Sequence, residues 1–159
     1  MKERYYLAYG SNLNIRQMQR RCPKARIIGT TEIEGYELLF KGSQTGAYLT
    51  IEEKAGGRVP AAVWATTAAD EAALDRYEGC PAFYYKACAV LPVKRLTSGE
   101  TSELEVYVYI MHEERRLGLP TWSYVETCVE GYRNFGLPEN VLWEAVEETR
   151  RRIHEAKKH

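Results

Sequence analysis

The first segment that could do chemistry is the stretch Tyr5–Asn14, which predicts a strand, a tight glycine turn and a helix. Its first five residues are aromatic or apolar, as in a buried strand, and the run stops at Gly10. Ser11 and Asn12 follow, and both are turn formers whose side chains bond nearby backbone groups. Because Gln17 stands at capping-box distance from the last residue of the stretch, a helix is expected to begin there.

This turn could bind a carboxylate or an oxyanion. Such a turn can leave backbone N–H groups unpaired beside a helix N-terminus, where negative charge is favoured. Gly10 lets the backbone approach a ligand closely. The alternative is an ordinary connection between a strand and a helix, since Gly-Ser-Asn turns are common.

Glu78 is the acidic residue that we single out for proton transfer. Residues 67–79 are rich in helix formers, with Thr67 or Asp70 as a cap and Gly79 as the C-terminal stop. An acid at a helix C-terminus opposes the helix dipole, and partial burial raises the pKa further, towards the range of a proton shuttle. The alternative is that Glu78 is a solvated residue without a chemical role, as most surface acids are.

Length and charge restrict the class of protein. The 159 residues suffice for one domain with a proper core, and we expect a single domain over residues 1–159. Lys plus Arg equals Asp plus Glu at 22 each, which argues against nucleic-acid or membrane partners recognised by bulk charge. Residues 1–4 lead straight into the first strand without a signal-peptide pattern, so a cytoplasmic location is expected.

The cysteines and histidines predict neither a metal site nor a cofactor site. The four cysteines form no Cys-x-x-Cys pair and no zinc-like cluster with the three histidines, so free thiols are expected. The chain has no Gly-x-Gly-x-x-Gly and no phosphate-binding loop. We therefore expect no cofactor and no metal.

The order of the elements predicts an α+β domain with a mixed or antiparallel sheet that could close into a barrel. A hairpin turn is expected over Lys54–Arg58, and the loop between the last two strands over 94–103. The strands are expected at 25–31 and 35–41 (or one long bent strand), 47–52, 59–66, 83–93 and 104–111, and the late helices at 123–135 and about 138–156.

These motifs together resemble the gamma-glutamylcyclotransferase family. The resemblance lies in Tyr9-Gly10-Ser11-Asn12-Leu13, followed by Leu74-Asp75-x-x-Glu78-Gly79 and then Tyr85. It extends over almost the whole chain through Ala62-Val63-Trp64, Val108-Tyr109-Ile110-Met111 and Gly136-Leu137-Pro138. The turn with Glu-Gly at this distance is more specific than either part alone.

The resemblance implies a small mixed β-barrel with flanking helices and a pocket at the end of the barrel. It implies an enzyme without a cofactor that releases 5-oxoproline and an amine or amino acid from a small γ-glutamyl compound, with Glu78 as general acid and base. Because Tyr84 stands next to Tyr85, the resemblance leaves open which of these two tyrosines faces the pocket. The substrate-binding residues that the resemblance implies are Tyr6, Leu7, Ala8, Tyr9, Gly10, Ser11, Asn12, Tyr85 and Tyr124.

Other functions stay open at this point. The substrate could instead be a γ-glutamyl amine, a γ-glutamyl group on a larger carrier, or glutathione, and the protein could be a non-catalytic module that binds a small acidic ligand. A cysteine amidase using Cys80 would need His112 as its base, at an arbitrary spacing. The oligomeric state, a homodimer included, also stays open.

Overall fold

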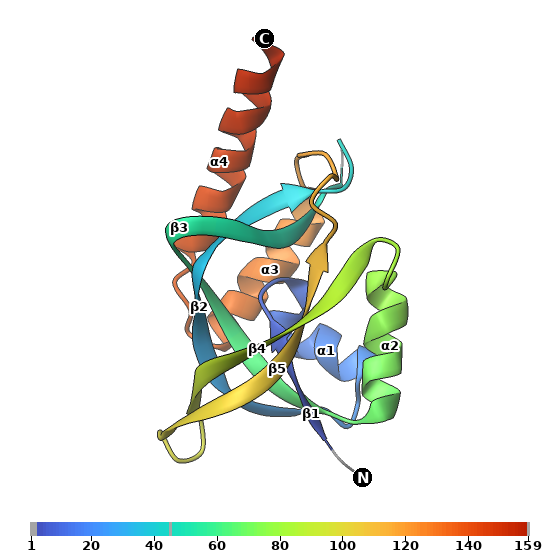
Figure 1. Cartoon of the computed structure of the whole chain (residues 1–159), viewed down its shortest axis with the longest axis vertical. Coiled ribbons are helices and arrows are strands. Elements are labelled where there is room, and N and C mark those ends of the chain that lie inside the picture. The colour runs from blue at the N-terminus through green and yellow to red at the C-terminus, as the bar shows by residue number, and fades with distance from the viewer. Residues whose placement is uncertain (1–2, 45, 159) are drawn as a thin grey trace.

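The computed structural model describes residues 3–44 and 46–158, which form a closed five-stranded barrel with helices around it (Figure 1). The strands follow one another around the barrel in the order β1, β3, β2, β4, β5. The elements are β1 (Arg4–Ala8), η1 (a 3₁₀ turn, Ser11–Leu13), α1 (Ile15–Arg21), β2 (Arg26–Lys41), β3 (Tyr48–Thr66), α2 (Ala68–Glu78), β4 (Tyr84–Arg95), β5 (Thr101–Met111), α3 (Trp122–Asn134) and α4 (Asn140–Lys157).

Strands β2 and β3 form one long antiparallel hairpin, and this corrects the expected turn over Lys54–Arg58. The chain does not reverse there, because β3 pairs with β2 on both sides of that segment, from Tyr48 to Ala65. Residues 54–57 form a bulge opposite Gly35 instead. The reversal lies between β2 and β3, and β2 is the single bent strand that the sequence allowed.

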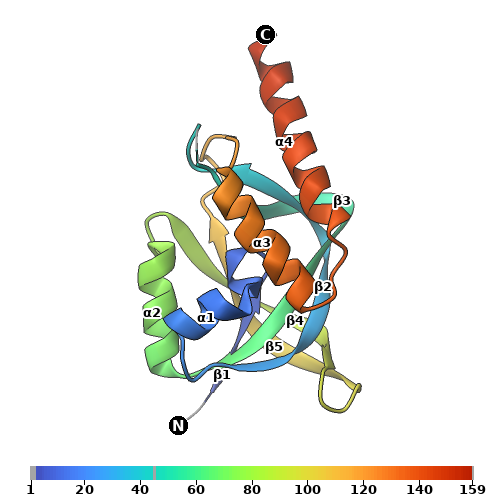
Figure 2. The same cartoon turned by 180° about the vertical axis from the view of Figure 1, so that it is seen from behind.

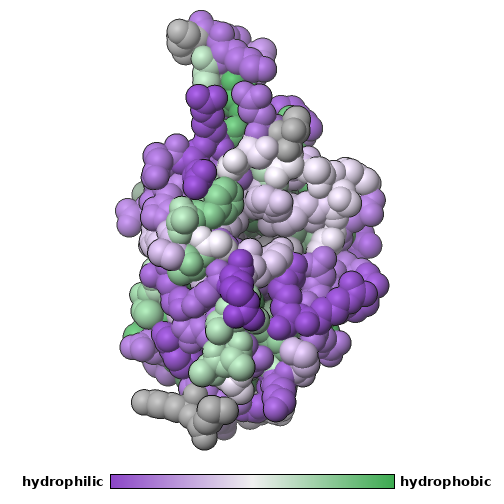
Figure 3. Space-filling model, turned by 90° about the vertical axis from the view of Figure 1, so that its right-hand side faces the viewer, coloured by the Kyte–Doolittle hydropathy of each residue, from purple (hydrophilic) through white to green (hydrophobic). Residues whose placement is uncertain are grey.

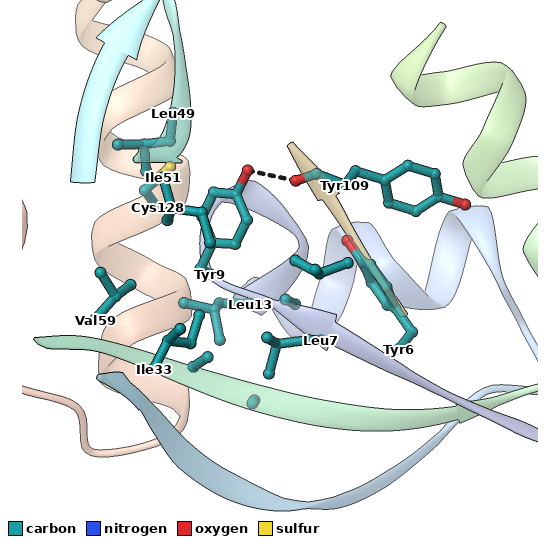
Figure 4. Close-up of a cluster of buried hydrophobic side chains, with 14 of the residues drawn as sticks. Tyr6, Leu7, Tyr9, Leu13, Ile33, Leu49, Ile51, Val59, Tyr109 and Cys128 are labelled. Carbon is teal, nitrogen blue, oxygen red and sulfur yellow. Dashed lines mark hydrogen bonds between the residues drawn. The ribbon is translucent and has the colours of Figure 1, made fainter. Parts of the chain in front are cut away.

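The first strand closes the barrel. β1 runs antiparallel to β3 and parallel to β5, where Tyr5 faces Val106 and Tyr6 faces Tyr107. Figure 4 shows Tyr6 and Leu7 of β1 in the buried core, together with Tyr9 just after the strand, whose hydroxyl donates a hydrogen bond to the backbone oxygen of Tyr109 at 2.7 Å. The residues that follow β1 are therefore held at one end of the barrel.

Helices α1 and α3 lie side by side on one face of the barrel, and α2 lies at its edge next to α1 (Figure 2). Helix α3 rests directly on η1. A Cβ added at Gly131 would lie 2.6 Å from the backbone nitrogen of Asn14 and 2.7 Å from Leu13, so this close approach requires glycine. Helix α4 contacts β2 and then extends away from the barrel.

Helix ends follow the local chemistry that the sequence predicts. Asn14 accepts a hydrogen bond from the backbone of Gln17 and begins α1. Thr67 and Asp70 form a capping box at the start of α2, and Gly79 ends that helix in the left-handed conformation. None of the described helices is long and apolar enough to span a bilayer.

Candidate active site

The turn after β1 forms the short 3₁₀ segment η1, and the first N–H groups of this segment make no hydrogen bond within it. Leu13 and Asn14 donate backbone hydrogen bonds to the carbonyls of Gly10 and Ser11. In the described chain, the hydrogen bonds leave the N–H groups of Gly10, Ser11 and Asn12 unused. Unpaired N–H groups at the start of a helical turn attract an anion.

Gly10 lies against the wall of the adjoining cavity. A Cβ added there would lie 3.5 Å from the hydroxyl oxygen of Tyr124 and 3.5 Å from Leu49, so a larger residue would occupy cavity space. The glycine therefore leaves room for a ligand beside the backbone.

The cavity joins this turn to the end of α2. It measures about 170 Å³. Among the described residues that line it, Glu78 is the one with a formal charge at neutral pH. The lining residues are Tyr6, Leu7, Tyr9, Gly10, Ser11, Asn12, Tyr48, Leu49, Tyr77, Glu78, Phe83, Tyr84, Tyr109 and Tyr124.

Glu78 is the last residue of α2, and its side chain is partly buried. Burial raises the pKa of Glu78 from its ordinary value of 4.5 to about 7, while the positive charge of Arg21 opposes this rise. No hydrogen bond or ion pair within the described chain engages this carboxyl group. Glu78 can therefore both accept and donate a proton near neutral pH.

Four buried tyrosines of the cavity remain protonated at neutral pH. Burial holds the pKa of Tyr6, Tyr9, Tyr84 and Tyr124 above the usual range. Tyr6 accepts a hydrogen bond from the side-chain amide of Asn12 at 3.0 Å, so its own proton is available to a ligand. The cavity thus offers neutral donors around one titratable acid.

The structure brings most of the predicted substrate-binding residues into this cavity, with two exceptions. Ala8 is buried but does not line it. Tyr85 lies outside, where its hydroxyl bonds Glu113 at 2.5 Å and its ring packs on His112. Tyr84 takes the place expected for Tyr85 and bonds the backbone oxygen of Leu49 at 2.8 Å.

Besides Tyr84, five lining residues were not among the predicted site residues. Leu49 and Tyr48 come from the start of β3, and Tyr109 comes from β5, so strand pairing rather than a local motif brings them in. Tyr77 precedes Glu78 on α2 and is 43% exposed. Its position next to the predicted acid could have identified Tyr77 from the sequence, whereas no sequence feature pointed to Phe83.

The cysteine alternative finds no matching geometry. His112 bonds the backbone oxygen of Pro81 at 2.7 Å rather than Cys80. Burial raises the pKa of the Cys80 thiol, which makes a thiolate scarcer. In residues 3–44 and 46–158, no group of three or more His, Cys, Asp or Glu side chains is arranged to hold a metal ion.

Comparisons with known proteins agree with this architecture. The family described as "Gamma-glutamyl cyclotransferase, AIG2-like" matches residues 6–126. The human gamma-glutamylcyclotransferase is 30% identical over 140 residues, covering 84% of this chain and 72% of the relative, and the bovine protein of that name is 28% identical over 140 residues.

Solved structures share the fold. One titled gamma-glutamyl cyclotransferase has a TM-score of 0.75 at 23% identity and covers 91% of this chain and 86% of its own. A yeast structure titled as a cyclotransferase specific to glutathione has a TM-score of 0.63 at 10% identity, covering 94% of this chain and 97% of its own. With the family match over residues 6–126, the chain belongs to the gamma-glutamyl cyclotransferase, AIG2-like, family.

Proposed function

We propose that this protein is a gamma-glutamylcyclotransferase in which Glu78 is the general acid and base. The observation that carries the proposal is the meeting of one unpaired carboxyl group, with a pKa raised to about 7, and the Gly10–Asn12 turn in a single cavity. A group that exchanges a proton near neutral pH and a turn that binds an anion are what cyclisation of a γ-glutamyl compound needs.

The size of the cavity suits the γ-glutamyl group alone. A cavity of about 150 Å³ accommodates a benzene-sized guest, and this one measures about 170 Å³. The leaving group then lies at the mouth, beside the two most exposed lining residues, Tyr48 and Tyr77, which are 44% and 43% exposed. The inner surface selects the glutamyl part, and the aromatic mouth contacts the leaving amine.

The reaction is an intramolecular aminolysis in which all atoms are conserved. The carboxylate of Glu78 removes a proton from the α-ammonium group of the substrate, and the freed amine attacks the γ-carbonyl carbon. A new C–N bond closes the ring of 5-oxoproline, and the original amide C–N bond breaks. Glu78 returns this proton to the departing nitrogen, then takes the second proton from the ring nitrogen and passes it to the released amine, which leaves as an ammonium ion, so the enzyme ends as it began.

The remaining cavity groups bind and orient the substrate. Because the nucleophile is tethered to the electrophile, most of the rate enhancement comes from holding the conformer that cyclises. The N–H groups of the Gly10–Asn12 turn and the hydroxyl of Tyr6 offer neutral donors to the α-carboxylate or to the oxygen that develops negative charge. Neutral donors leave Glu78 free to work at a pKa near 7.

The test is 5-oxoproline release by wild type and by Glu78→Gln, measured by mass spectrometry. Glutamine keeps the shape of the side chain but cannot exchange the proton, so turnover should fall by roughly two to four orders of magnitude. Glu126→Gln on α3 is the matched control, because that side chain is exposed and lies outside the cavity. Unchanged product release by Glu78→Gln would remove Glu78 from the mechanism.

A panel of substrates identifies the leaving group. γ-Glutamyl amino acids, γ-glutamyl amines, a γ-glutamyl group linked to a carrier and glutathione are incubated separately with the pure protein. 5-Oxoproline from the first class supports the proposal as stated, and product from another class alone assigns a related cyclotransferase. Binding of a γ-glutamyl compound without turnover of any would assign a non-catalytic binding module.

A further inference from the structure

Arg21, the last residue of α1, contacts both halves of the site without lining the cavity. Its guanidinium carbon lies 3.5 Å from the centre of the Tyr77 ring. The same group donates a hydrogen bond to the side-chain oxygen of Asn12 at 2.5 Å. One side chain thus touches the turn after β1 and the end of α2.

These contacts continue into the cavity through two hydrogen bonds. Asn12 uses its amide nitrogen to bond the hydroxyl of Tyr6 at 3.0 Å, so Arg21 orients that amide and leaves the proton of Tyr6 for a ligand. On the other side, the hydroxyl of Tyr77 lies 3.3 Å from the hydroxyl of Ser11. The guanidinium therefore positions two donors that face the substrate.

Arg21 is also the one cation in the described chain that acts on the Glu78 carboxyl. The titratable groups that face this carboxyl from other elements are neutral acids near pH 7: Tyr6 and Tyr9 from β1 and its end, Tyr84 from β4, and Cys80 from the turn after α2. Arg21 follows Asn12 by nine residues, at the far end of α1, and Figure 2 shows α1 running towards α2.

We propose that Arg21 is a positioning residue. It joins the turn after β1 to the end of α2, and it supplies the positive charge beside which Glu78 ionises. The proposal rests on Glu78 acting as the acid and base of the reaction. Arginine suits this task because a planar guanidinium stacks on an aromatic ring while its edge donates hydrogen bonds, which an ammonium group does less well.

Three variants separate the charge of Arg21 from its geometry. Arg21→Met removes both, and Arg21→Gln serves the same test with a polar side chain if the methionine variant does not fold. Arg21→Lys keeps the charge but loses the planar stack. Arg20→Met is the matched control, because Arg20 precedes Arg21 in the last turn of α1, is exposed and lies away from the cavity.

The first measurement is an NMR titration of the Glu78 carboxyl carbon, which needs no turnover and so reports on Arg21 even if the proposed reaction fails. Arg21→Met or Arg21→Gln should move the midpoint to higher pH, and Arg21→Lys should stay close to wild type. A wild-type midpoint in both uncharged variants, or an equal shift in Arg20→Met, would overturn the proposal.

The second measurement is the pH profile of kcat/KM for 5-oxoproline release. Loss of Arg21 should lower kcat/KM roughly 10- to 100-fold at pH 6, with a smaller loss above pH 8, because both the charge and the placement of the turn change. Arg21→Lys should raise KM more than it lowers kcat. An equal loss of activity at every pH, together with an unshifted carboxyl titration, would leave Arg21 with a structural role only and refute the proposal.

Discussion

Replacing Glu78 with glutamine should stabilise the protein above neutral pH while it removes turnover. In the folded chain the pKa of Glu78 is about 7, because burial penalises the charged carboxylate. In the unfolded chain the same group returns to its ordinary value of 4.5. Between these values the folded chain holds a proton that the unfolded chain has lost, so raising the pH lowers the free energy of unfolding.

The magnitude follows from the size of the pKa shift. A rise from 4.5 to about 7 corresponds to about 3 kcal/mol of lost stability once the pH exceeds the folded pKa. That value is an upper one, because Glu78 remains partly exposed and water screens its charge. Glutamine does not ionise, so the variant should match wild type below pH 4.5 and exceed it by up to about 3 kcal/mol at pH 8.

Urea denaturation of both proteins at pH 4.5, 6 and 8 measures this difference. The gap should widen with pH, and most of it should appear between pH 4.5 and 7. Glu126→Gln, at an exposed position on α3, should differ from wild type by a small amount that is the same at every pH. A constant gap for Glu78→Gln, or one that narrows as the pH rises, would refute the burial of this carboxyl.

Four further variants test how the site is held. Gly131→Ala should cost about 1–3 kcal/mol in urea denaturation and lower kcat/KM, because the new methyl group would lie 2.7 Å from Leu13 and push α3 off the turn; unchanged stability would contradict this contact. Tyr84→Phe should lower kcat/KM, whereas Tyr85→Phe should leave kinetics unchanged, and the reverse result would place Tyr85 in the cavity. Thr67→Ala should cost about 1 kcal/mol, read from the same denaturation curves, and an unaffected midpoint would argue against the capping box.

Local patterns predicted the helices well and the long hairpin poorly. The caps at Asn14 and Thr67 and the stop at Gly79 depend on neighbouring residues, and all three are confirmed. The segment 54–57 contains a pair of glycines, which is typical of both a reversal and a bulge. The partner strand decides between them, and β2 continues past this point, so the prediction of a reversal was wrong.

The site shows the same division between local and distant information. The turn after β1 and Glu78 were singled out as short motifs with a chemical reason, and both line the cavity. Tyr48 and Tyr109 reach the cavity because their strands pair around the barrel, which no local spacing reveals. Tyr84 and Tyr85 differ only in the phase of β4, and a shift of one residue exchanges the two faces of a strand.

Surface composition gives little guidance beyond the site. On the side drawn in Figure 3, hydrophobic residues form small separate patches among hydrophilic ones. Trp122 is 65% exposed and packs against Trp143, but this pair lies outside the cavity. The candidate site of the proposed reaction is the cavity between β1 and α2.

Closure of the barrel by β1 and β5 ties the appearance of the pocket to the late stages of folding. Tyr6 lies at the start of the chain, yet its neighbour Tyr107 is synthesised only after four other barrel segments. Pairings between residues so distant in sequence form slowly, because a large loop must be ordered first. While the ribosome is still translating β4, the edge of the first strand that later pairs with β5 is open, and open strand edges tend to pair with other chains.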